Sequence, residues 1–293
     1  MSASRPCPAC LSTDARVAGP KNGYDILVCR SCGTIYTSRL PEASETEDYD
    51  AYYTDANLTT PEFIRDRVRE IVEEFATYRV TNRFLEIGFG AGTILSEAQR
   101  QGWDAYGTEV SATACEHARE AGRQVFHGEL REAKFESDHF DIVAASEILE
   151  HLPDPAAELA EIVRILRPGG LFWATTPSAR SLSFRLMGPE WTTISPPEHT
   201  QLYSIAGARL MLLKAGFEEI RLVTSGLNPS EIVNHFRGGP AHGERFDRVG
   251  TAYELNEKLT RSPLRRGIKD GLNSMLNLLG LGDSIKIFAV KPQ

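Results

Sequence analysis

The stretch from Leu85 to Thr93, LEIGFGAGT, sets the first expectation about the fold of this chain. An acid, Glu86, stands among apolar residues just before three glycines at alternate positions, Gly88, Gly90 and Gly92. A helical pattern follows, so the stretch is typical of a strand that turns sharply into a helix. Glycines in such a turn let the backbone approach a bound ligand without a Cβ clash.

The spacing of the glycines indicates which kind of ligand fits. A dinucleotide fingerprint reads GxGxxG, and a phosphate-binding P-loop carries a lysine after its glycines. This chain has GxGxG followed by Thr93, without that lysine. The Glu86 carboxylate would repel a pyrophosphate and attract a cation. S-adenosylmethionine has a sulfonium, an ammonium and no phosphate, so the turn favours this methyl donor.

Further donor contacts are expected after the following strands. Glu109 ends the second predicted strand (YGTEVS), where a carboxylate can accept hydrogen bonds from both ribose hydroxyls. Glu129 or Leu130 would edge the adenine ring, and Ser146 lies in the loop after strand four, which borders the donor. The alternative is a glycine turn with scattered surface acids. The ordered series of Glu86, glycines and Glu109 favours a donor site.

Strands and helices alternate from residue 83 onward, which predicts a parallel sheet covered by helices. The helix within AAELAEIVRILRPGG is expected to stop at its glycines. The stretch 228–283 has helical patterns such as YELNEKL and GLNSMLNLLG and is predicted to form a helical cap before the last strand, IKIFAVKP. The predicted fold class is therefore α/β, with helices on both faces of the sheet.

Four of the five cysteines form two CxxC pairs near the start of the chain: Cys7, Cys10, Cys29 and Cys32. Two such pairs separated by about twenty residues are typical of a tetrahedral zinc site. Four thiolates complete a closed shell, so the ion would be structural. Two disulfides or idle thiols are the alternative, and a cytosolic setting disfavours disulfides. Cys115 lies in a predicted helix and is expected to be a buried apolar residue.

The predicted organisation is a zinc ribbon over 1–40, a linker with an N-terminal helix over 41–82, and the α/β domain over 83–293. Thr60 is the expected cap of the helix, with Pro61 in its first turn. Tyr49, Tyr52 and Tyr53 stand in the linker. They are predicted to form an aromatic lid over the donor or the acceptor, with Tyr53 in contact with the donor, or else to pack the linker onto the sheet.

These motifs resemble a known family. LEIGFGAGT, YGTEVS, FDIVAASEILEHLPDP and LRPGGLFWATTP are similar to successive motifs of class I S-adenosylmethionine-dependent methyltransferases, over about 83–226 and again through GDSIKIFAVKP. The resemblance implies a Rossmann-like seven-stranded sheet of order 3-2-1-4-5-7-6 with strand seven antiparallel. It also implies a donor lying across Glu86, the three glycines and Glu109. Phe89 departs from the family, where small residues or Cys are more usual.

The N-terminal cysteine module is similar to that of a subgroup of bacterial methyltransferases acting on sugars or natural-product intermediates. Glu198-His199 resembles the catalytic pair of deoxysugar C-methyltransferases. His199 is the predicted general base, with Glu198 orienting it or contacting substrate. Glu147 and His151, in the loop after strand four, are further catalytic candidates. In the alternative reading, His199 anchors its loop by hydrogen bonds.

The composition fits a small-molecule enzyme. The net charge of −8 argues against extended contact with nucleic acid, which needs many cations. We expect a cytoplasmic chain, since neither a signal peptide nor a run approaching a membrane span is visible. The predicted function is methyl transfer to O, C or N of a sugar, nucleotide sugar or natural-product intermediate. A zinc-ribbon rRNA or tRNA methyltransferase is the runner-up, and a non-enzymatic binding module is a third reading.

Overall fold

The computed structural model describes residues 4–45, 49–54, 58–237 and 263–293. The chain divides into two compact units. Unit 1 comprises residues 1–44, 176–210 and 222–286, and unit 2 comprises 45–175, 211–221 and 287–293. The predicted helix YELNEKL lies outside the described residues. In the part of the chain that is described, no helix combines the length and apolarity needed to cross a bilayer.

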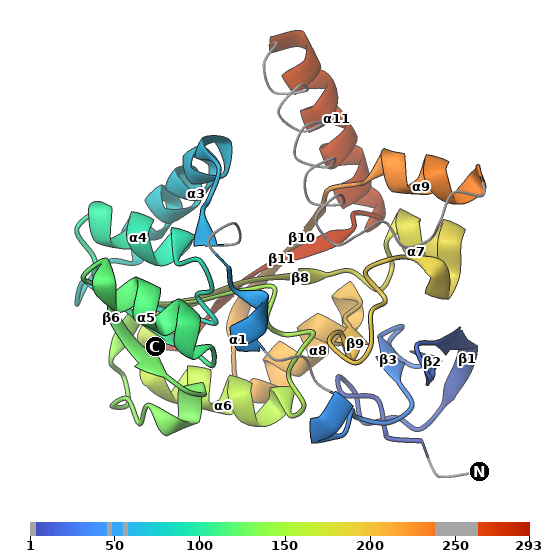
Figure 1. The fold of residues 1–293 in the computed structure, drawn as a ribbon, viewed down its shortest axis with the longest axis horizontal. Coiled ribbons are helices and arrows are strands. Elements are labelled where there is room, and N and C mark those ends of the chain that lie inside the picture. Colours follow the sequence, from blue (N-terminus) through green and yellow to red (C-terminus); the bar gives the residue numbers. More distant parts are fainter. Residues whose placement is uncertain (1–3, 46–48, 55–57, 238–262) are drawn as a thin grey trace. The chain divides into compact units, whose positions relative to one another are not determined.

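A seven-stranded sheet is the main element of the fold (Figure 1), in the order β10-β11-β8-β7-β4-β5-β6. Its strands are β4 (Arg83–Ile87), β5 (Asp104–Glu109), β6 (Gln124–His127), β7 (Phe140–Ser146), β8 (Leu166–Pro177), β10 (Glu218–Ser225) and β11 (Ser284–Val290). Strands β6, β5, β4, β7 and β8 are all parallel to one another. Numbered in chain order, this is the predicted order 3-2-1-4-5-7-6, which is confirmed.

The last strand, β11, runs against β8. Near one end the N–H of Gly169 donates to the carbonyl of Lys291, and near the other the N–H of Ser178 donates to the carbonyl of Asp283. The partner number falls as the β8 number rises, so the two strands are antiparallel. This confirms the strand direction that the family resemblance implies.

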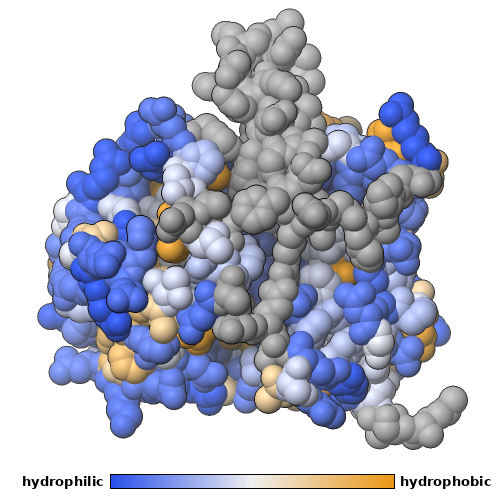
Figure 2. Space-filling view, in the orientation of Figure 1, coloured by the Kyte–Doolittle hydropathy of each residue, from blue (hydrophilic) through white to orange (hydrophobic). Residues whose placement is uncertain are grey.

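Helices of unit 2 cover both faces of the sheet. In Figure 1, α3 (Glu62–Glu74), α4 (Thr93–Arg100) and α5 (Ala112–Glu120) lie on one side of β4–β6, and α6 (Pro155–Ile165) lies on the other. Figure 2 shows a mostly hydrophilic surface over α3–α5, as expected for amphipathic helices whose apolar faces are buried. The core beneath this layer includes Val72, Phe75, Phe84 and Trp173.

Two local predictions are wrong. Thr60 does not cap α3, because the residue before the helix is Pro61 and no side chain in the described part of the chain caps it. The Thr60 hydroxyl instead lies 2.6 Å from that of Thr93. Helix α6 ends at Ile165, and the chain passes directly into β8, which contains the glycines that were predicted to stop the helix. Sheet pairing with β7 and β11 takes these residues, so tertiary hydrogen bonds override the local stop signal.

Unit 1 contains a four-stranded sheet of order β1-β2-β3-β9. Its strands are β1 (Ala15–Lys21), β2 (Tyr24–Cys29), β3 (Ile35–Thr37) and β9 (Gln201–Leu202). The first three strands carry the cysteines and their hairpins, but β9 comes from a distant part of the chain and was not predicted. The remaining α-helices of the described chain are α1 (Tyr49–Tyr52), α7 (Leu182–Met187), α8 (Ile205–Ala215), α9 (Pro229–Phe236) and α11 (Pro263–Leu279).

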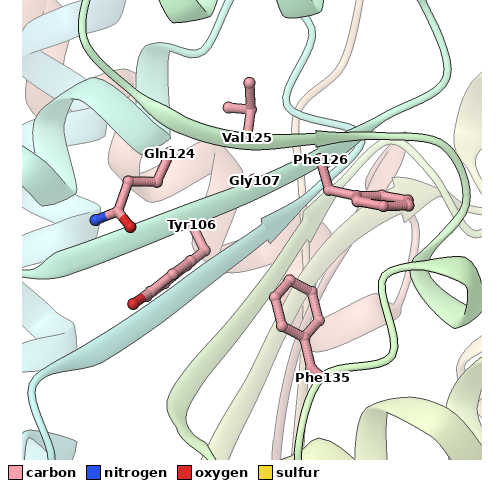
Figure 3. A pocket seen from close by; sticks show the side chains of 6 residues that line it. All are labelled: Tyr106, Gly107, Gln124, Val125, Phe126 and Phe135. Atoms are coloured by element: carbon pink, nitrogen blue, oxygen red, sulfur yellow. The ribbon is translucent and has the colours of Figure 1, made fainter.

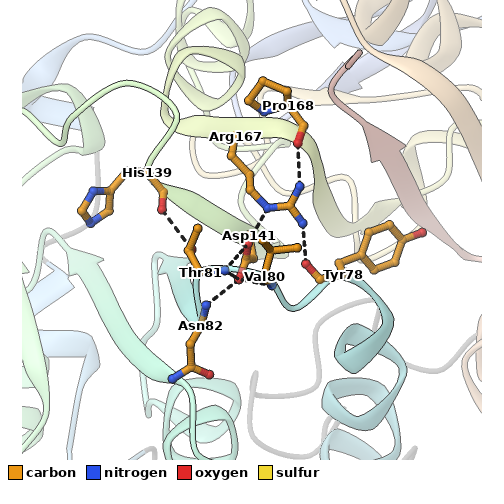
Figure 4. A network of polar contacts seen from close by, with 8 residues as sticks. All are labelled: Tyr78, Val80, Thr81, Asn82, His139, Asp141, Arg167 and Pro168. Atoms are coloured by element: carbon orange, nitrogen blue, oxygen red, sulfur yellow. Dashed lines mark hydrogen bonds and ion pairs between the residues drawn. The ribbon is translucent and has the colours of Figure 1, made fainter.

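Asp141 forms a buried polar network near the start of β7 (Figure 4). Its fully buried carboxylate accepts hydrogen bonds from the backbone N–H groups of Val80, Thr81 and Asn82 and from Nε of Arg167. Arg167 also donates to the carbonyls of Tyr78 and Pro168. Burial alone would raise the pKa of Asp141, but Arg167 and the backbone donors outweigh it, and the pKa is lowered.

Replacing Asp141 by alanine is expected to reduce the free energy of unfolding by about 3–5 kcal/mol, because it removes the acceptor of a mostly buried guanidinium and of three backbone N–H groups. Urea unfolding measures the effect, and an exposed acid on α5, Glu116→Ala, is the control. The folded-state pKa of Asp141 lies below its unfolded value, so its contribution is present near neutral pH and is lost as the pH falls. A loss below 1 kcal/mol at pH 7 would contradict this role.

Candidate functional site

The glycine turn has the backbone that the sequence predicted. Gly88, Gly90 and Gly92 have φ angles of 61°, 51° and 68°, in the left-handed region that favours glycine. A Cβ on Gly90 would lie 2.8 Å from the hydroxyl oxygen of Tyr53, and one on Gly88 would lie 2.1 Å from Cδ1 of Ile148. The turn therefore requires glycine for its backbone angles and for its crowded surroundings.

Two carboxylates organise this turn from within unit 2. Oε2 of Glu86 accepts a 2.7 Å hydrogen bond from the N–H of Leu95, in the first turn of α4. It supplies the cap that Gly92, the residue before α4, cannot provide. Oε2 of Glu109 accepts from the N–H of Gly90 at 3.0 Å, and its Oε1 accepts from the N–H groups of Val110 and Ser111. The predicted donor acids thus also hold the turn in shape.

Glu86 has a counter-ion that the sequence did not indicate. Burial raises the pKa of the Glu86 carboxyl to about 8, repulsion from Glu109 adds to this, and the Leu95 N–H and the Arg123 guanidinium oppose it. Arg123 stands just before β6, and its buried Nη1 has no hydrogen-bond partner among the residues that the structure describes. That nitrogen lies 2.9 Å from where a Cβ of Gly92 would be. No local sequence pattern could indicate Arg123, because this residue is distant from the glycine turn in the sequence and lies beside it only in the folded chain.

Removing the Arg123 charge is expected to shift the pH dependence of donor affinity. The ionised Glu86 would attract the ammonium group of the ligand, so wild-type affinity for S-adenosylhomocysteine should rise as the pH passes through about 8. In Arg123→Met the pKa of Glu86 is higher still, so affinity at pH 7 falls about tenfold and recovers only at higher pH. Arg123→Lys should retain most of it. Calorimetry from pH 6 to 9 measures the curve.

The ammonium of the ligand also titrates in this range, so Glu86→Gln is the control. Because this variant lacks the Glu86 carboxyl, the pH dependence of its affinity reports the titration of the ligand without that of Glu86. If the affinity of Arg123→Met changes with pH in the same way as that of the wild type, Arg123 only packs against the turn and its charge does not act on Glu86.

The raised pKa of Glu86 affects the stability of the fold in the opposite direction from donor affinity. Its contribution to stability is present at acid pH and is lost as the pH rises through the folded value.

Phe89 is accommodated in a way that explains its departure from the family. Its side chain is buried, and a Cβ on Gly107 of β5 would lie 2.6 Å from Cδ1 of Phe89 and 3.1 Å from Cδ2 of Leu95. The large ring occupies space left by a glycine on the neighbouring strand. The large Phe89 and the small Gly107 thus fill the core beneath the turn together, as a closely packed interior requires.

The other predicted donor residues have different surroundings. Glu129 is exposed and forms a capping box with Glu132 at the short 3-10 helix Leu130–Glu132, whose Leu130 is buried. The hydroxyl of Ser146 lies 2.9 Å from that of Thr175. Tyr53 is partly buried against the core of unit 2 and beside the glycine turn, with its ring edge-on to Tyr52.

Asp50 fastens the aromatic segment in place. Its Oδ1 accepts hydrogen bonds from the hydroxyl of Ser111 at 2.8 Å and from the N–H of Thr113 at 3.2 Å. Ser111 is the N-cap of α5 and Thr113 lies in its first turn, and the hydrogen bonds lower the pKa of Asp50. The segment that carries Tyr52 and Tyr53 is therefore anchored to the end of β5. Asp50 was not among the predicted site residues.

The loop after β7 carries the catalytic candidates of unit 2. Glu147 is exposed and has a φ of 56°, an uncommon value for a residue other than glycine. Its carboxyl has side-chain hydrogen bonds with Thr175 and Glu150. Glu150 is fully buried, and the N–H of His151 donates to the carbonyl of Ile148. Residues with a backbone strained in the way that Glu147 is are enriched at functional sites.

The Glu198-His199 pair lies in unit 1, in a loop that follows a cis Pro196–Pro197 bond. The backbone N–H groups of Glu198 and His199 both donate to the carbonyl of Ser195. Nδ1 of His199 lies 2.7 Å from the carbonyl oxygen of Thr193, so it donates and carries the proton. Nε2 is then the acceptor nitrogen of the ring, as a general base requires.

The four N-terminal cysteines converge on one point in unit 1. Their sulfur atoms all lie within 4.8 Å of one another, with Cys7 and Cys32 3.6 Å apart and Cys10 and Cys29 3.5 Å apart. Tetrahedral zinc with ~2.3 Å bonds to sulfur needs edges of ~3.8 Å. These separations exceed an S–S bond of ~2.05 Å, and all five cysteines are free. The donor set therefore fits a structural zinc ion.

A pocket lies on the sheet at strands β5 and β6 (Figure 3). It is lined by Tyr106, Gly107, Gln124, Val125, Phe126 and Phe135. The rings of Tyr106 and Phe135 meet edge-on, with centroids 6.3 Å apart, and Figure 3 shows both on the side of the strands opposite Val125. The pocket contains none of the predicted donor or catalytic residues, so we do not assign the donor to it.

The seven-stranded sheet and the acid-flanked glycine turn define a Rossmann-like S-adenosylmethionine-dependent methyltransferase. A family model described as a methyltransferase domain matches residues 60–222, more than half of the chain. The chain therefore belongs to this methyltransferase family.

Relatives and solved structures agree with the family. The chain is 33% identical over 125 residues to a ubiquinone biosynthesis O-methyltransferase of Methylococcus capsulatus, covering 40% of the chain and 53% of the relative. It is 31% identical over 160 residues to the protein of that name from Aromatoleum aromaticum, covering 50% and 68%. In the first case the chain spans only about half the length of the relative.

Among solved structures, a SAM-dependent methyltransferase from Archaeoglobus fulgidus matches with a TM-score of 0.55 at 17% identity, covering 83% of this chain and all of that one. Phosphoethanolamine N-methyltransferase 2 of Haemonchus contortus, in complex with S-adenosyl-L-methionine, matches with a TM-score of 0.53 at 21% identity, covering 88% and 63%. At these identities the likeness concerns the fold alone.

Proposed function

We propose that this methyltransferase moves the methyl group of S-adenosylmethionine to a hydroxyl oxygen of a small-molecule acceptor. The assignment of S-adenosylmethionine as the methyl donor rests on one observation. Two carboxylates, Glu86 and Glu109, lie around a glycine turn that has no phosphate-binding lysine. The O-methyltransferase names of the relatives support oxygen as the acceptor atom. A sugar, nucleotide sugar or natural-product intermediate fits the acidic chain.

In this proposal the donor lies along the glycine turn. Glu109 binds the ribose hydroxyls, and Glu86 attracts the cationic end. Leu130 and Glu129 border the adenine, and Ser146 and Tyr53 complete the contacts. The cysteine cluster holds a structural zinc ion, supported by the fit of its sulfur separations. The ribbon comprises residues 1–40, the lid 41–82, and the methyltransferase domain 83–293, with a cap at about 228–283 to which α9 and α11 belong.

The proposed reaction is an in-line displacement. The acceptor oxygen attacks the methyl carbon as its proton passes to Nε2 of His199, and the bond from carbon to sulfur breaks. The products are a methyl ether, neutral S-adenosylhomocysteine and protonated His199. The hydrogen bond from Nδ1 to the Thr193 carbonyl fixes the ring for this role and stabilises the imidazolium. Glu198 orients the base or contacts the acceptor, and Glu147 and His151 are secondary candidates for proton transfer.

A turnover assay tests the proposal. Release of S-adenosylhomocysteine is measured with 3,4-dihydroxybenzoate as a phenolic probe and UDP-glucose as a sugar probe, and mass spectrometry locates the added methyl. His199→Ala is expected to lower the rate about 100-fold or more, as for a general base, with unchanged affinity for S-adenosylhomocysteine. His117→Ala, an exposed histidine on α5, is the control. Unchanged turnover in His199→Ala would remove His199 from the reaction.

A further inference from the structure

The ribbon of unit 1 pairs with the loop that carries His199. Strand β3 of the ribbon forms an antiparallel ladder with β9, with Ile35 opposite Leu202 and Tyr36 opposite Gln201. The N–H of Thr37 extends this ladder by donating to the carbonyl of Thr200 at 3.0 Å. The residue directly after His199 is therefore fixed by the ribbon through its backbone.

Arg5 strengthens the same attachment. Its Nη2 donates to the carbonyl of Thr200 at 2.5 Å and to Oε1 of Gln201 at 3.2 Å, while its Nε donates to the carbonyl of Thr37 at 2.9 Å. One guanidinium thus bridges the last residue of β3 and the loop at Thr200. Hydrogen bonds from a charged donor are stronger than neutral ones, and this one is part-buried.

A second attachment lies on the other side of His199. In the turn between β1 and β2, Asn22 has a φ of 47°, and its side-chain Nδ2 donates to the carbonyl of Pro196 at 2.8 Å. Beyond β9, the hydroxyl of Ser204 donates to the carbonyl of Cys32. The ribbon therefore contacts the chain at Pro196, at Thr200–Leu202 and at Ser204, on both sides of the Glu198-His199 pair.

We propose that the cysteine ribbon is a positioning module for the acceptor side of the enzyme, in which Arg5 and Asn22 are positioning residues that set the place of His199. The loop needs such support because Pro196–His199 lie in neither a helix nor a strand. Its two ends are held by a rigid hairpin module, while Thr193 orients the ring. This inference rests on the proposed role of His199, but the attachment itself is independent of that role.

The test compares the full-length variants Asn22→Asp and Arg5→Met with the wild type. Aspartate tolerates the left-handed backbone of Asn22 but has no N–H to donate. Arg16→Met, which removes an exposed cation from β1, is the matched control for Arg5→Met, and Arg5→Lys retains the charge. Three quantities are measured: amide hydrogen exchange of residues 193–204, affinity for S-adenosylhomocysteine, and the rate of methyl transfer to 3,4-dihydroxybenzoate.

We expect exchange across 193–204 to rise and turnover to fall about tenfold in both variants, because Asn22→Asp loses one part-buried hydrogen bond to the loop and Arg5→Met loses several from a charged donor. Donor affinity should stay within about twofold of the wild type, and Arg5→Lys should recover part of the rate. Exchange that stays at the wild-type level, or donor affinity that falls in parallel with the rate, would overturn the proposal.

Failure of the proposed function gives a different pattern. A wild-type protein that binds the donor product but does not methylate the probe contradicts the acceptor assignment, whereas the exchange measurement still decides whether Arg5 and Asn22 hold the loop. A rate that falls in His199→Ala but not in Asn22→Asp or Arg5→Met would keep the proposed base and reject the positioning role.

Discussion

Replacing Glu109 by alanine is expected to lower the affinity for S-adenosylhomocysteine by about 100-fold or more. The change removes the proposed acceptor of two ribose hydrogen bonds, each worth about 1.5 kcal/mol when the partner is charged. It also removes the acceptor for the N–H groups of Gly90, Val110 and Ser111, which shape the glycine turn. Isothermal titration calorimetry measures the affinity, and unfolding curves show whether the fold persists.

Two further variants separate binding from structure. Glu109→Gln keeps the shape of the side chain and one acceptor oxygen, so its loss of affinity should be smaller than that of alanine. Glu116→Ala removes an exposed acid from α5 and should bind as the wild type does. If Glu109→Ala binds within threefold of the wild type, the ribose contact is wrong. If neither it nor the wild type binds, the donor site itself lies elsewhere.

The second large effect is expected at the cysteine cluster. The purified chain should contain one zinc ion, and Cys10→Ser should lose it. In small peptides structural zinc contributes an apparent roughly 10–16 kcal/mol, so the ribbon without its ion is expected to unfold. Elemental analysis gives the metal content, and amide exchange over β1–β3 reports the folding of the ribbon.

Cys115→Ala is the control for this experiment, because Cys115 is buried in α5 of unit 2 and should leave the metal content unchanged. A native protein that has no bound metal and four thiols reactive toward a small reagent would contradict the zinc assignment. A Cys10→Ser protein that loses zinc but keeps slow exchange over β1–β3 would mean that the hairpins fold without the ion.

Much of the candidate site could be read from the sequence because its signals are local. The three glycines mark a turn by their own backbone freedom, and Glu86 stands in the same nine-residue stretch. The two CxxC pairs each form one knuckle, so their spacing alone indicates a four-sulfur cluster. The strand order followed from the family resemblance, and the register of β4 with β5 and β7 agrees with it.

Other features escaped the sequence because they depend on contacts between distant residues. Thr60 looks like a cap but contacts Thr93 instead, and the glycines after α6 lie inside β8 because neighbouring strands take their hydrogen bonds. The two residues of β9 are too few to show a period of their own. Only the fold brings them to the edge of the ribbon.

The sequence by itself determined the glycine turn, the cysteine cluster and the class of enzyme, since each depends on residue types at short, fixed spacings. The tertiary structure decided which groups act on those residues: Arg123 on Glu86, Asp50 on the start of α5, and the ribbon on the loop of His199. The physical reason is that charge pairing and strand pairing act through space, and only the folded chain brings residues that are far apart in sequence close together.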